Sequence, residues 1–258
     1  FEDRYEDMAK AVGIDPKTKQ TIKFDLSDDN FINAYFDILH HGYEKDGVNF
    51  WGIDWQQGKK STVKGLDPLW ALNHLHYLDN CRDGKRGVIL SRFAGAGSHR
   101  YPLGFSGDSV ATWKSLDFQP YMTSTAGNIG YGWWSHDIGG HAFGIYDDEL
   151  YLRWCQLGVF SPVNRLHSTA HDLQGKEPWR HCETVEKITE DFLRLRHRLV
   201  PYIYTAMKNA SDYGISLCEP PYYNYPDDDG AYRIKNEYFF GSELLVCPVT
   251  SKRIKSLN

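Results

Sequence analysis

Two aspartates are the residues of this 258-residue chain whose type and setting best suit catalysis. Asp54 closes the apolar run 48–54, and Asp108 closes the glycine-rich stretch 101–108. Glycosidic bonds break through an oxocarbenium-like transition state, so one carboxylate must be ionised near the anomeric carbon while a second, protonated acid donates to the leaving oxygen. Asp54 is followed by polar residues and suits the ionised role. Asp108 lies near Phe105 and Trp113 in sequence, so we expect it to be partly desolvated and to keep its proton.

Both acids are expected at the carboxyl ends of parallel strands. The runs 48–54 and 87–91 are mostly apolar over the length of a strand, and Arg92 follows the second run. Such runs fit strands covered on both faces, and in a β/α barrel the chemistry sits at the carboxyl ends of these strands. Apolar residues recur at helical spacing in the intervening segments 31–39, 69–78, 113–116, 151–157 and 183–211. The alternation predicts an α/β fold, a (β/α)8 TIM-type barrel.

The strand count predicts that the barrel is incomplete in this chain. Five strands can be recognised, ending near residues 54, 92, 108, 137 and 165, whereas a closed barrel has eight. We therefore expect the C-terminal part of the barrel, about strands 4–8, with the missing N-terminal part of the barrel as a structural partner. The expected organisation is a loop after a missing strand at 1–24, the barrel segment at 25–240, and the start of a small β domain at 241–258.

Composition narrows the classes of function. The formal net charge is −5 and the lysines and arginines are scattered, so nucleic acid is not an expected partner. No apolar run is long enough to span a membrane and no signal-like segment is seen, which favours a soluble protein. The compartment is unknown from the sequence, and the cytoplasm or the periplasm is favoured. Aromatic residues make up 15% of the chain, which suits the apolar faces of sugars as well as a large core.

Five segments in order resemble glycoside hydrolase family 31, the α-glucosidase and α-xylosidase family. They are FWGIDWQQ (50–57), SRFAGAGSHRYPLGFSGD (91–108), WSHDIGG (134–140), FSPVNRLH (160–167) and GSELLVCP (241–248). The resemblance implies Asp54 as nucleophile and Asp108 as acid/base. It further implies sugar contacts from Arg92, Asp137 and His167, and we expect Trp51 and Phe105 to be the aromatic residues that contact substrate.

The family resemblance implies a retaining α-glycoside hydrolase that acts by double displacement and needs neither a metal nor an organic cofactor. The expected substrate is an α-linked gluco-oligosaccharide. An α-xylosidase or an α-transglucosidase of the same family is the alternative, because Gly52, Phe105 and His141 depart from residues that many family members carry, and these departures put sugar selectivity in doubt.

Several other interpretations stay open at this stage. Asp54, Asp108 and Asp137 also suit helix or turn caps, and Arg92 suits a structural ion pair. A zinc hydrolase built on His136 and His141, or on His74 and His76, lacks the HExxH pattern and a cysteine partner. A truncated barrel that is catalytically incompetent is the non-enzymatic alternative, since an open sheet edge would destabilise it.

Overall fold

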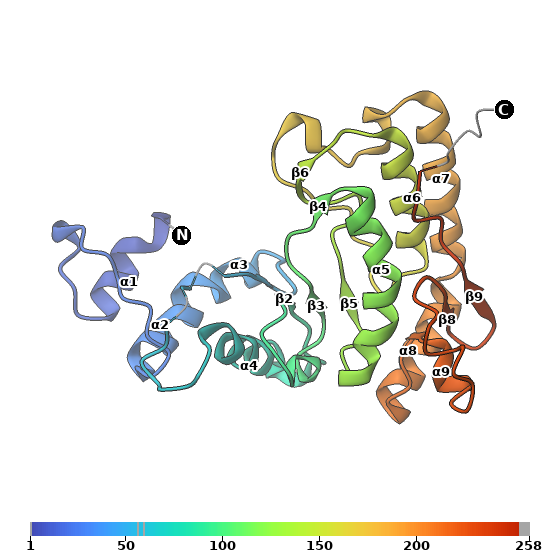
Figure 1. Cartoon of the computed structure of the whole chain (residues 1–258). Helices are drawn as coiled ribbons and strands as arrows, with labels where there is room; N and C mark the ends of the chain where they lie inside the picture. The colour runs from blue at the N-terminus through green and yellow to red at the C-terminus, as the bar shows by residue number, and fades with distance from the viewer. Residues whose placement is uncertain (1, 56, 59, 253–258) are drawn as a thin grey trace. The chain divides into compact units, whose positions relative to one another are not determined.

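The structure, a computed structural model, describes residues 2–55, 57–58 and 60–252 and divides into two units, Phe1–Gly104 and Phe105–Asn258. Each unit contains its own buried apolar clusters. Helices and short strands alternate along the chain in both units (Figure 1). This order is the one that the apolar periodicity predicted.

The first unit is mainly helical. Its helices are α1 (Tyr5–Ala11), α2 (Asp29–Leu39), α3 (His41–Lys45) and α4 (Pro68–Asn80), with the short 3-10 helices η1 (Glu2–Arg4), η2 (Pro16–Thr18), η3 (Arg82–Gly84) and η4 (Ser98–Arg100). The expectation of a loop throughout residues 1–24 was wrong at α1. Met8 of α1 is buried with Phe31 and Ala34 of α2, so burial of an apolar face stabilises this short helix.

Two parallel strands carry the predicted strand ends of the first unit. Strand β1 (Gly52–Ile53) pairs with β2 (Leu90–Arg92), with Ile53 opposite Ser91. Both strands are shorter than the apolar runs that predicted them. One reason is that the Asn80 side chain, not a neighbouring strand, donates to the Asn49 carbonyl at 2.9 Å. Asp54 and Arg92 nevertheless lie at the carboxyl end of this pair, as the sequence predicted.

The second unit combines short parallel strands with longer helices. Strand β3 (Gly104–Phe105) lies at the start of the unit, followed by β4 (Val110–Ala111), β5 (Trp134–Ser135) and β6 (Ala142–Gly144). Strands β4 and β6 are parallel, and Ile138 forms an isolated parallel bridge with Leu166. The predicted strand over 128–135 is reduced to β5, because residues before it form the 3-10 helix η5 (Ala126–Ile129), which ends at Gly130 with φ +73°.

Helices α5 (Trp113–Thr125), α6 (Asp148–Val159) and α7 (Glu183–Arg198) surround the core of the second unit. In Figure 1 α6 and α7 run beside each other. The expected bend near Pro201 is present, since α7 ends and α8 (Val200–Tyr213) begins there with the proline in its first turn. Trp154 of α6 and Ile138 are fully buried in this core.

The remaining elements connect the strand ends to the C-terminal part. The 3-10 helices η6 (Asp172–Gln174) and η7 (Pro178–Arg180) precede α7. Strands β7 (Cys218–Glu219), β8 (Tyr238–Phe240) and β9 (Leu244–Val246) form an antiparallel sheet, with α9 (Pro221–Asn224) after β7.

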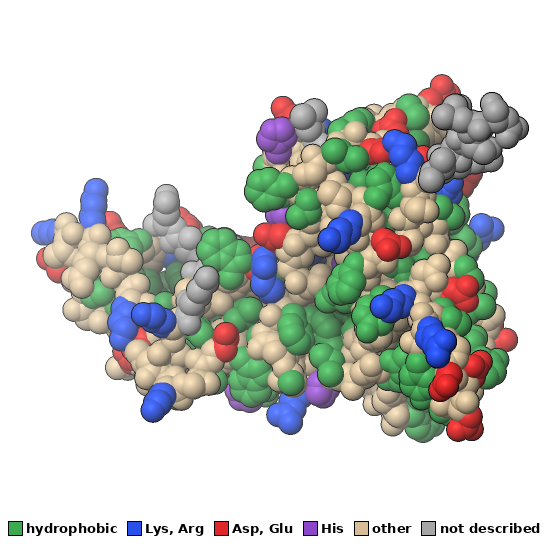
Figure 2. Space-filling view, viewed as in Figure 1, with side chains coloured by type: hydrophobic (Ala, Val, Ile, Leu, Met, Phe, Trp, Pro, Cys, Tyr) green, Lys and Arg blue, Asp and Glu red, His purple; other side chains and the backbone are tan. Residues whose placement is uncertain are grey.

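The described surface agrees with the composition. On the face drawn in Figure 2, lysine and arginine side chains are scattered among acidic ones and form no continuous basic band. Among the described helices, none has both the length and the apolar character that crossing a bilayer requires.

Candidate active site

In the first unit the structure brings Asp54 and Arg92 together. The Arg92 Nε to Asp54 Oδ1 distance is 2.5 Å, and the same carboxylate oxygen accepts a hydrogen bond from the Trp55 backbone at 2.9 Å. The Asp54 side chain remains 31% exposed, so its carboxylate is accessible from solvent. Because Asp54 directly follows β1 and Arg92 is the last residue of β2, the ion pair is a direct result of the β1–β2 register. Asp54 therefore has an arginine partner at a strand end, which a simple helix cap does not require.

Trp51 contacts the helices of the first unit. Its indole nitrogen donates to Glu44 Oε1 at 2.8 Å, and its ring meets His40 edge to face at a centroid distance of 4.5 Å. Side chains alternate along a strand, so Trp51 shares a face with the buried Ile53 and opposes Asp54. These contacts favour a structural role, and the prediction that Trp51 contacts a sugar stays a prediction.

Asp137 is the most buried acid among the predicted site residues. Its side chain is 1% exposed, Arg165 Nη2 donates to Oδ1 at 2.6 Å, and the Ser109 backbone donates to Oδ2 at 3.2 Å. Burial raises the pKa of the Asp137 carboxyl, while Arg165, His141 and the Ser109 N–H act in the opposite direction. Asp137 therefore does more than cap a glycine turn, because it anchors an arginine and the residue that follows Asp108.

The turn after Asp137 depends on glycine. Gly140 has φ +80° and its amide donates to the Asp137 carbonyl at 2.9 Å. A Cβ at this position would lie 2.6 Å from the Ala111 Cα, so a side chain would push the turn away from β4. This close approach leaves His141 beside the segment that carries Asp108.

Asp108 is more open than the sequence suggested. Its side chain is 56% exposed, which contradicts the expectation that Phe105 and Trp113 desolvate it. The physical reason is local: Gly107, with φ +93°, turns the chain between the buried Phe105 and Asp108. One titratable neighbour in space is His141, whose Nε2 lies 3.9 Å from Asp108 Oδ1.

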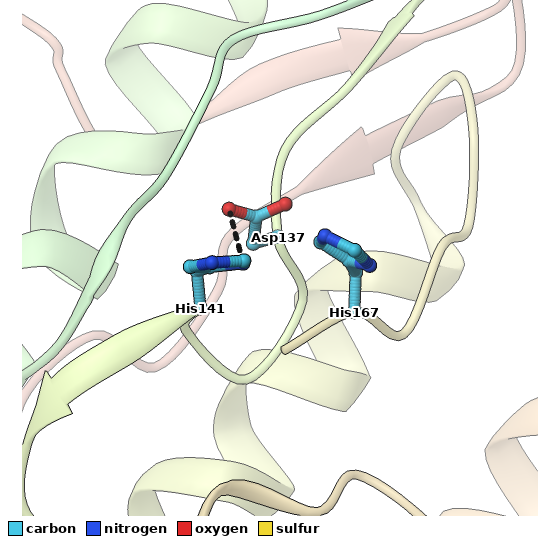
Figure 3. A group of neighbouring side chains, drawn as sticks. All are labelled: Asp137, His141 and His167. Atoms are coloured by element: carbon cyan, nitrogen blue, oxygen red, sulfur yellow. Dashed lines mark ion pairs between the residues drawn. The ribbon is translucent and has the colours of Figure 1, made fainter. Parts of the chain in front are cut away.

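His141 and His167 complete the group around Asp137. Figure 3 shows the three side chains side by side, with Asp137 between the two histidines and a dashed line joining His141 to Asp137. The two imidazole rings are 4.9 Å apart at 35°. The spacing of Asp137, His141 and His167 would also allow a metal ion, since their ligand atoms lie within 4.8 Å of one another. Arg165 already supplies a positive charge at Asp137 Oδ1, however, and a cation there would have to compete with it.

Phe105 supports this arginine. Its side chain is buried, and the Arg165 guanidinium carbon lies 4.9 Å from the ring centroid. Such stacking of a guanidinium on an aromatic face fixes the orientation of the arginine. The predicted contact between Phe105 and substrate stays a prediction, while its role beneath Arg165 follows from the observed geometry.

Sequence reasoning missed Arg165 and His141 as site residues. Arg165 stands two positions before His167 near the end of an expected strand, a spacing that places both residues on one face. His141 follows the double glycine after Asp137, and its position as a departure from the family pattern was the available signal. The signal at Arg165 does not identify its partner, because Arg165 and Asp137 are 28 residues apart in the sequence. The signal at His141 likewise does not indicate that the imidazole approaches Asp108.

Comparison with family models accounts for most of the chain. The glycosyl hydrolases family 31 TIM-barrel domain matches residues 6–206, and the glycosyl hydrolase family 31 C-terminal domain matches residues 214–258. The first match alone covers more than half of the chain, so the α/β TIM-barrel fold expected from the strand pattern is confirmed as part of such a domain.

Individual proteins are similar over most of this chain but only part of their own length. Alpha-glucosidase 2 of Bacillus thermoamyloliquefaciens is 32% identical, and the match covers 76% of this chain and 24% of that protein. An alpha-xylosidase of Saccharolobus solfataricus is 30% identical, and the match covers 77% of this chain and 27% of that protein. This chain therefore spans about a quarter of the length of these relatives.

Solved structures give the same picture. A GH31 alpha-xylosidase from a soil metagenome, complexed with xylose, matches with a TM-score of 0.76 at 30% identity, over 88% of this chain and 39% of its own. A GH31 dextranase of Flavobacterium johnsoniae, complexed with glucose, matches with a TM-score of 0.76 at 26% identity, and the match covers 90% of this chain and 32% of the dextranase chain. The chain belongs to glycoside hydrolase family 31. It contains part of the family's TIM-barrel domain, followed by a segment that matches the family's C-terminal domain.

Proposed function

We propose that the protein containing this chain is a retaining α-glycoside hydrolase, an α-glucosidase acting on α-linked gluco-oligosaccharides. The observation that carries the proposal is the Asp54–Arg92 ion pair at the carboxyl end of two parallel strands. In a barrel of this class, that end is where substrate is bound and converted. Family membership and the 32% identity to an alpha-glucosidase support the substrate class.

The proposed reaction has two displacements. In the first, Asp54 attacks the anomeric carbon while the bond to the leaving oxygen breaks and Asp108 gives that oxygen its proton. In the second, Asp108 takes a proton from water as the water oxygen bonds to the anomeric carbon and the Asp54 ester breaks. The sugar leaves with its α configuration retained, and both acids return to their starting state.

The other polar residues have orienting roles in this proposal. Arg92, next to Asp54, binds sugar hydroxyls and holds the nucleophile in place. Asp137 and His167, which lie together in the second unit, bind hydroxyls of the same sugar. Fixing the sugar in this way lowers the entropic part of the barrier, because the reacting atoms meet in one geometry.

The domain boundary is part of the proposal. The sequence predicted a barrel segment at 25–240 and a small β domain from 241, whereas the match to the C-terminal-domain model begins at residue 214. Strands β7 and β8 pair with β9 in one antiparallel sheet. Because a sheet is usually kept within one domain, this pairing favours a boundary near Gly214.

The test compares hydrolysis of 4-nitrophenyl α-glucoside and 4-nitrophenyl α-xyloside by the longest natural protein that contains this chain. We expect a higher kcat/KM on the glucoside and a loss of at least about 10³-fold in Asp54→Ala. Asp229→Ala, in an exposed turn, is the matched control and should retain activity. Wild-type activity should persist in a chelator.

Each result has a defined meaning. Preference for the xyloside would replace the α-glucosidase proposal with an α-xylosidase, which the 30% identical relative makes the second candidate. Activity that survives in Asp54→Ala would remove the nucleophile assignment. Parallel assays on the 258-residue chain test the incompetent-fragment alternative, which predicts activity in the longer protein alone.

A further inference from the structure

His141 lies between two carboxylates of the second unit. Its Nδ1 is 3.8 Å from Asp137 Oδ2, and its Nε2 is 3.9 Å from Asp108 Oδ1. Its side chain is only 16% exposed, and the His167 ring packs beside it. One imidazole therefore faces both the buried acid and the proposed acid/base.

The backbone fixes this imidazole relative to Asp108. The His141 amide donates to the Ser109 carbonyl at 2.7 Å, and the Ala142 amide donates to the same oxygen at 3.3 Å. The Thr169 amide donates to the His141 carbonyl at 3.0 Å. Since Ser109 directly follows Asp108, the two side chains extend from backbone segments that are hydrogen-bonded to each other.

The charge of Asp137 is compensated by other groups. Arg165 donates to Oδ1 and the Ser109 amide donates to Oδ2. Lys176 adds a further positive charge nearby. Its side chain packs against Gly139, where an added Cβ would lie 2.7 Å from the Lys176 Cδ. Burial lowers the pKa of Lys176, and the negative charge of Asp137 acts in the opposite direction. Because Asp137 is paired in this way, an N–H on the other side of His141 is available to Asp108.

We propose that His141 is a positioning residue that orients the Asp108 carboxyl for proton transfer. This inference rests on the proposed function, in which Asp108 is the acid/base. At 3.9 Å the Nε2–Oδ1 separation is longer than a hydrogen bond. Catalytic contacts are commonly long in the free enzyme and shorten when substrate binds, so a shift of about 1 Å is sufficient here.

The orienting contact acts while Asp108 is negatively charged. After Asp108 has given its proton to the leaving oxygen, it stays charged until water returns a proton in the second displacement. An imidazole N–H directed at Oδ1 stabilises that charge and limits rotation of the carboxyl group. His141 itself neither gains nor loses a proton in either step.

The test uses three variants in the longest natural protein containing this chain and two substrates. His141→Phe keeps an aromatic ring without N–H groups, His141→Gln places an amide N–H near the former Nε2, and His141→Asn places one near the former Nδ1. An α-linked glucose disaccharide has a leaving group that needs a proton, whereas α-glucosyl fluoride has one that needs little acid assistance.

The expected result is a split between substrates and between variants. In His141→Phe and His141→Asn, kcat/KM for the disaccharide falls roughly 10- to 100-fold, a part of the usual contribution of general acid–base catalysis. The loss on the fluoride is much smaller, and His141→Gln recovers most of the disaccharide activity. His197→Phe, on the exposed surface of α7, controls for the substitution. Equal losses on both substrates in all three variants would assign His141 a purely structural role and overturn the proposal.

A crystallographic comparison separates this inference from the proposed function. If the wild-type protein hydrolyses neither substrate, the proposed function fails. The position of Asp108 in wild-type and His141→Phe crystals then still decides the positioning role. We expect the Asp108 carboxyl to change its rotamer when the imidazole is removed, and an unchanged rotamer would overturn the inference whatever the activity.

Discussion

Arg165 and Asp137 form a buried ion pair at the centre of the second unit's polar cluster. Besides donating to Asp137 Oδ1 at 2.6 Å, Arg165 donates through Nε to Ser135 Oγ at 3.3 Å and lies over the Phe105 ring. The pair therefore connects β5, the turn after it and the segment that leads to His167. Breaking such a pair is costly because it leaves one charge buried without compensation.

We expect Arg165→Met to lower the free energy of unfolding by about 3 to 5 kcal/mol, because the Asp137 carboxylate loses its cation. Urea denaturation measures this loss. Arg194→Met, at an exposed pair with Glu190, is the matched control and should change stability little. The double variant Arg165→Met/Asp137→Asn should recover part of the loss, and a cost no larger than that of Arg194→Met would contradict a stabilising buried pair.

Acid should destabilise the protein through its buried histidines. Burial, assisted by the charge of Arg165, lowers the pKa of His136 from 6.5 to about 3. Burial likewise lowers the pKa of His40 to about 4 and that of His76 to about 3. Since the unfolded chain binds protons first, the stability contributed by neutral imidazoles is complete above pH 6.5 and declines as the pH falls toward these values.

The expected slope is about 1.4 kcal/mol per pH unit for each such histidine between pH 6 and 4.5. Urea unfolding at several pH values, on the wild type and on His136→Phe, measures it. In His136→Phe the unfolding free energy should change less steeply with pH, by about 1.4 kcal/mol per pH unit, whatever the stability of the variant at pH 7. Identical slopes would mean that His136 is not held neutral in the folded state.

The predictable part of the fold was local. Apolar runs that end in Asp54 and Arg92 placed both residues at strand ends, because alternating strands and helices leave few other arrangements. Strand lengths were not predictable in the same way. The Asn49 carbonyl is satisfied by Asn80, 31 residues away, and nothing near Asn49 in the sequence indicates that contact.

The site shows the same limit at the level of single side chains. Phe105 and Trp113 are close to Asp108 in sequence but do not bury it, and the positive φ of Gly107 separates the direction of Asp108 from that of the buried Phe105. His141 approaches Asp108 through a tertiary contact that depends on Gly140. Family resemblance predicts which residue types belong to a site, whereas the environment of each acid depends on long-range packing.

Trp51→Phe should affect stability and leave substrate affinity unchanged. Loss of the indole N–H leaves Glu44 Oε1 without this donor, and the Glu44 side chain is only 5% exposed. We expect a loss of about 1 to 3 kcal/mol in unfolding free energy, with an unchanged KM. Trp55→Phe, at a mostly exposed ring, is the control for stability. A raised KM at unchanged stability would instead support the sugar contact that the sequence predicted for Trp51.

The stereochemistry of the product tests the pairing of Asp54 with Asp108. Two successive displacements at the anomeric carbon each invert it, so the first sugar released from a 4-nitrophenyl α-glycoside should be the α anomer, which proton NMR detects before mutarotation. Retaining glycosidases in general hold their two carboxyl groups about 5 to 5.5 Å apart. Initial release of the β anomer would require a single displacement by water, which needs a wider separation of roughly 6.5 to 9.5 Å and a base in place of a nucleophile. Asp54 would then have to activate that water as a general base, with Arg92 orienting its carboxylate.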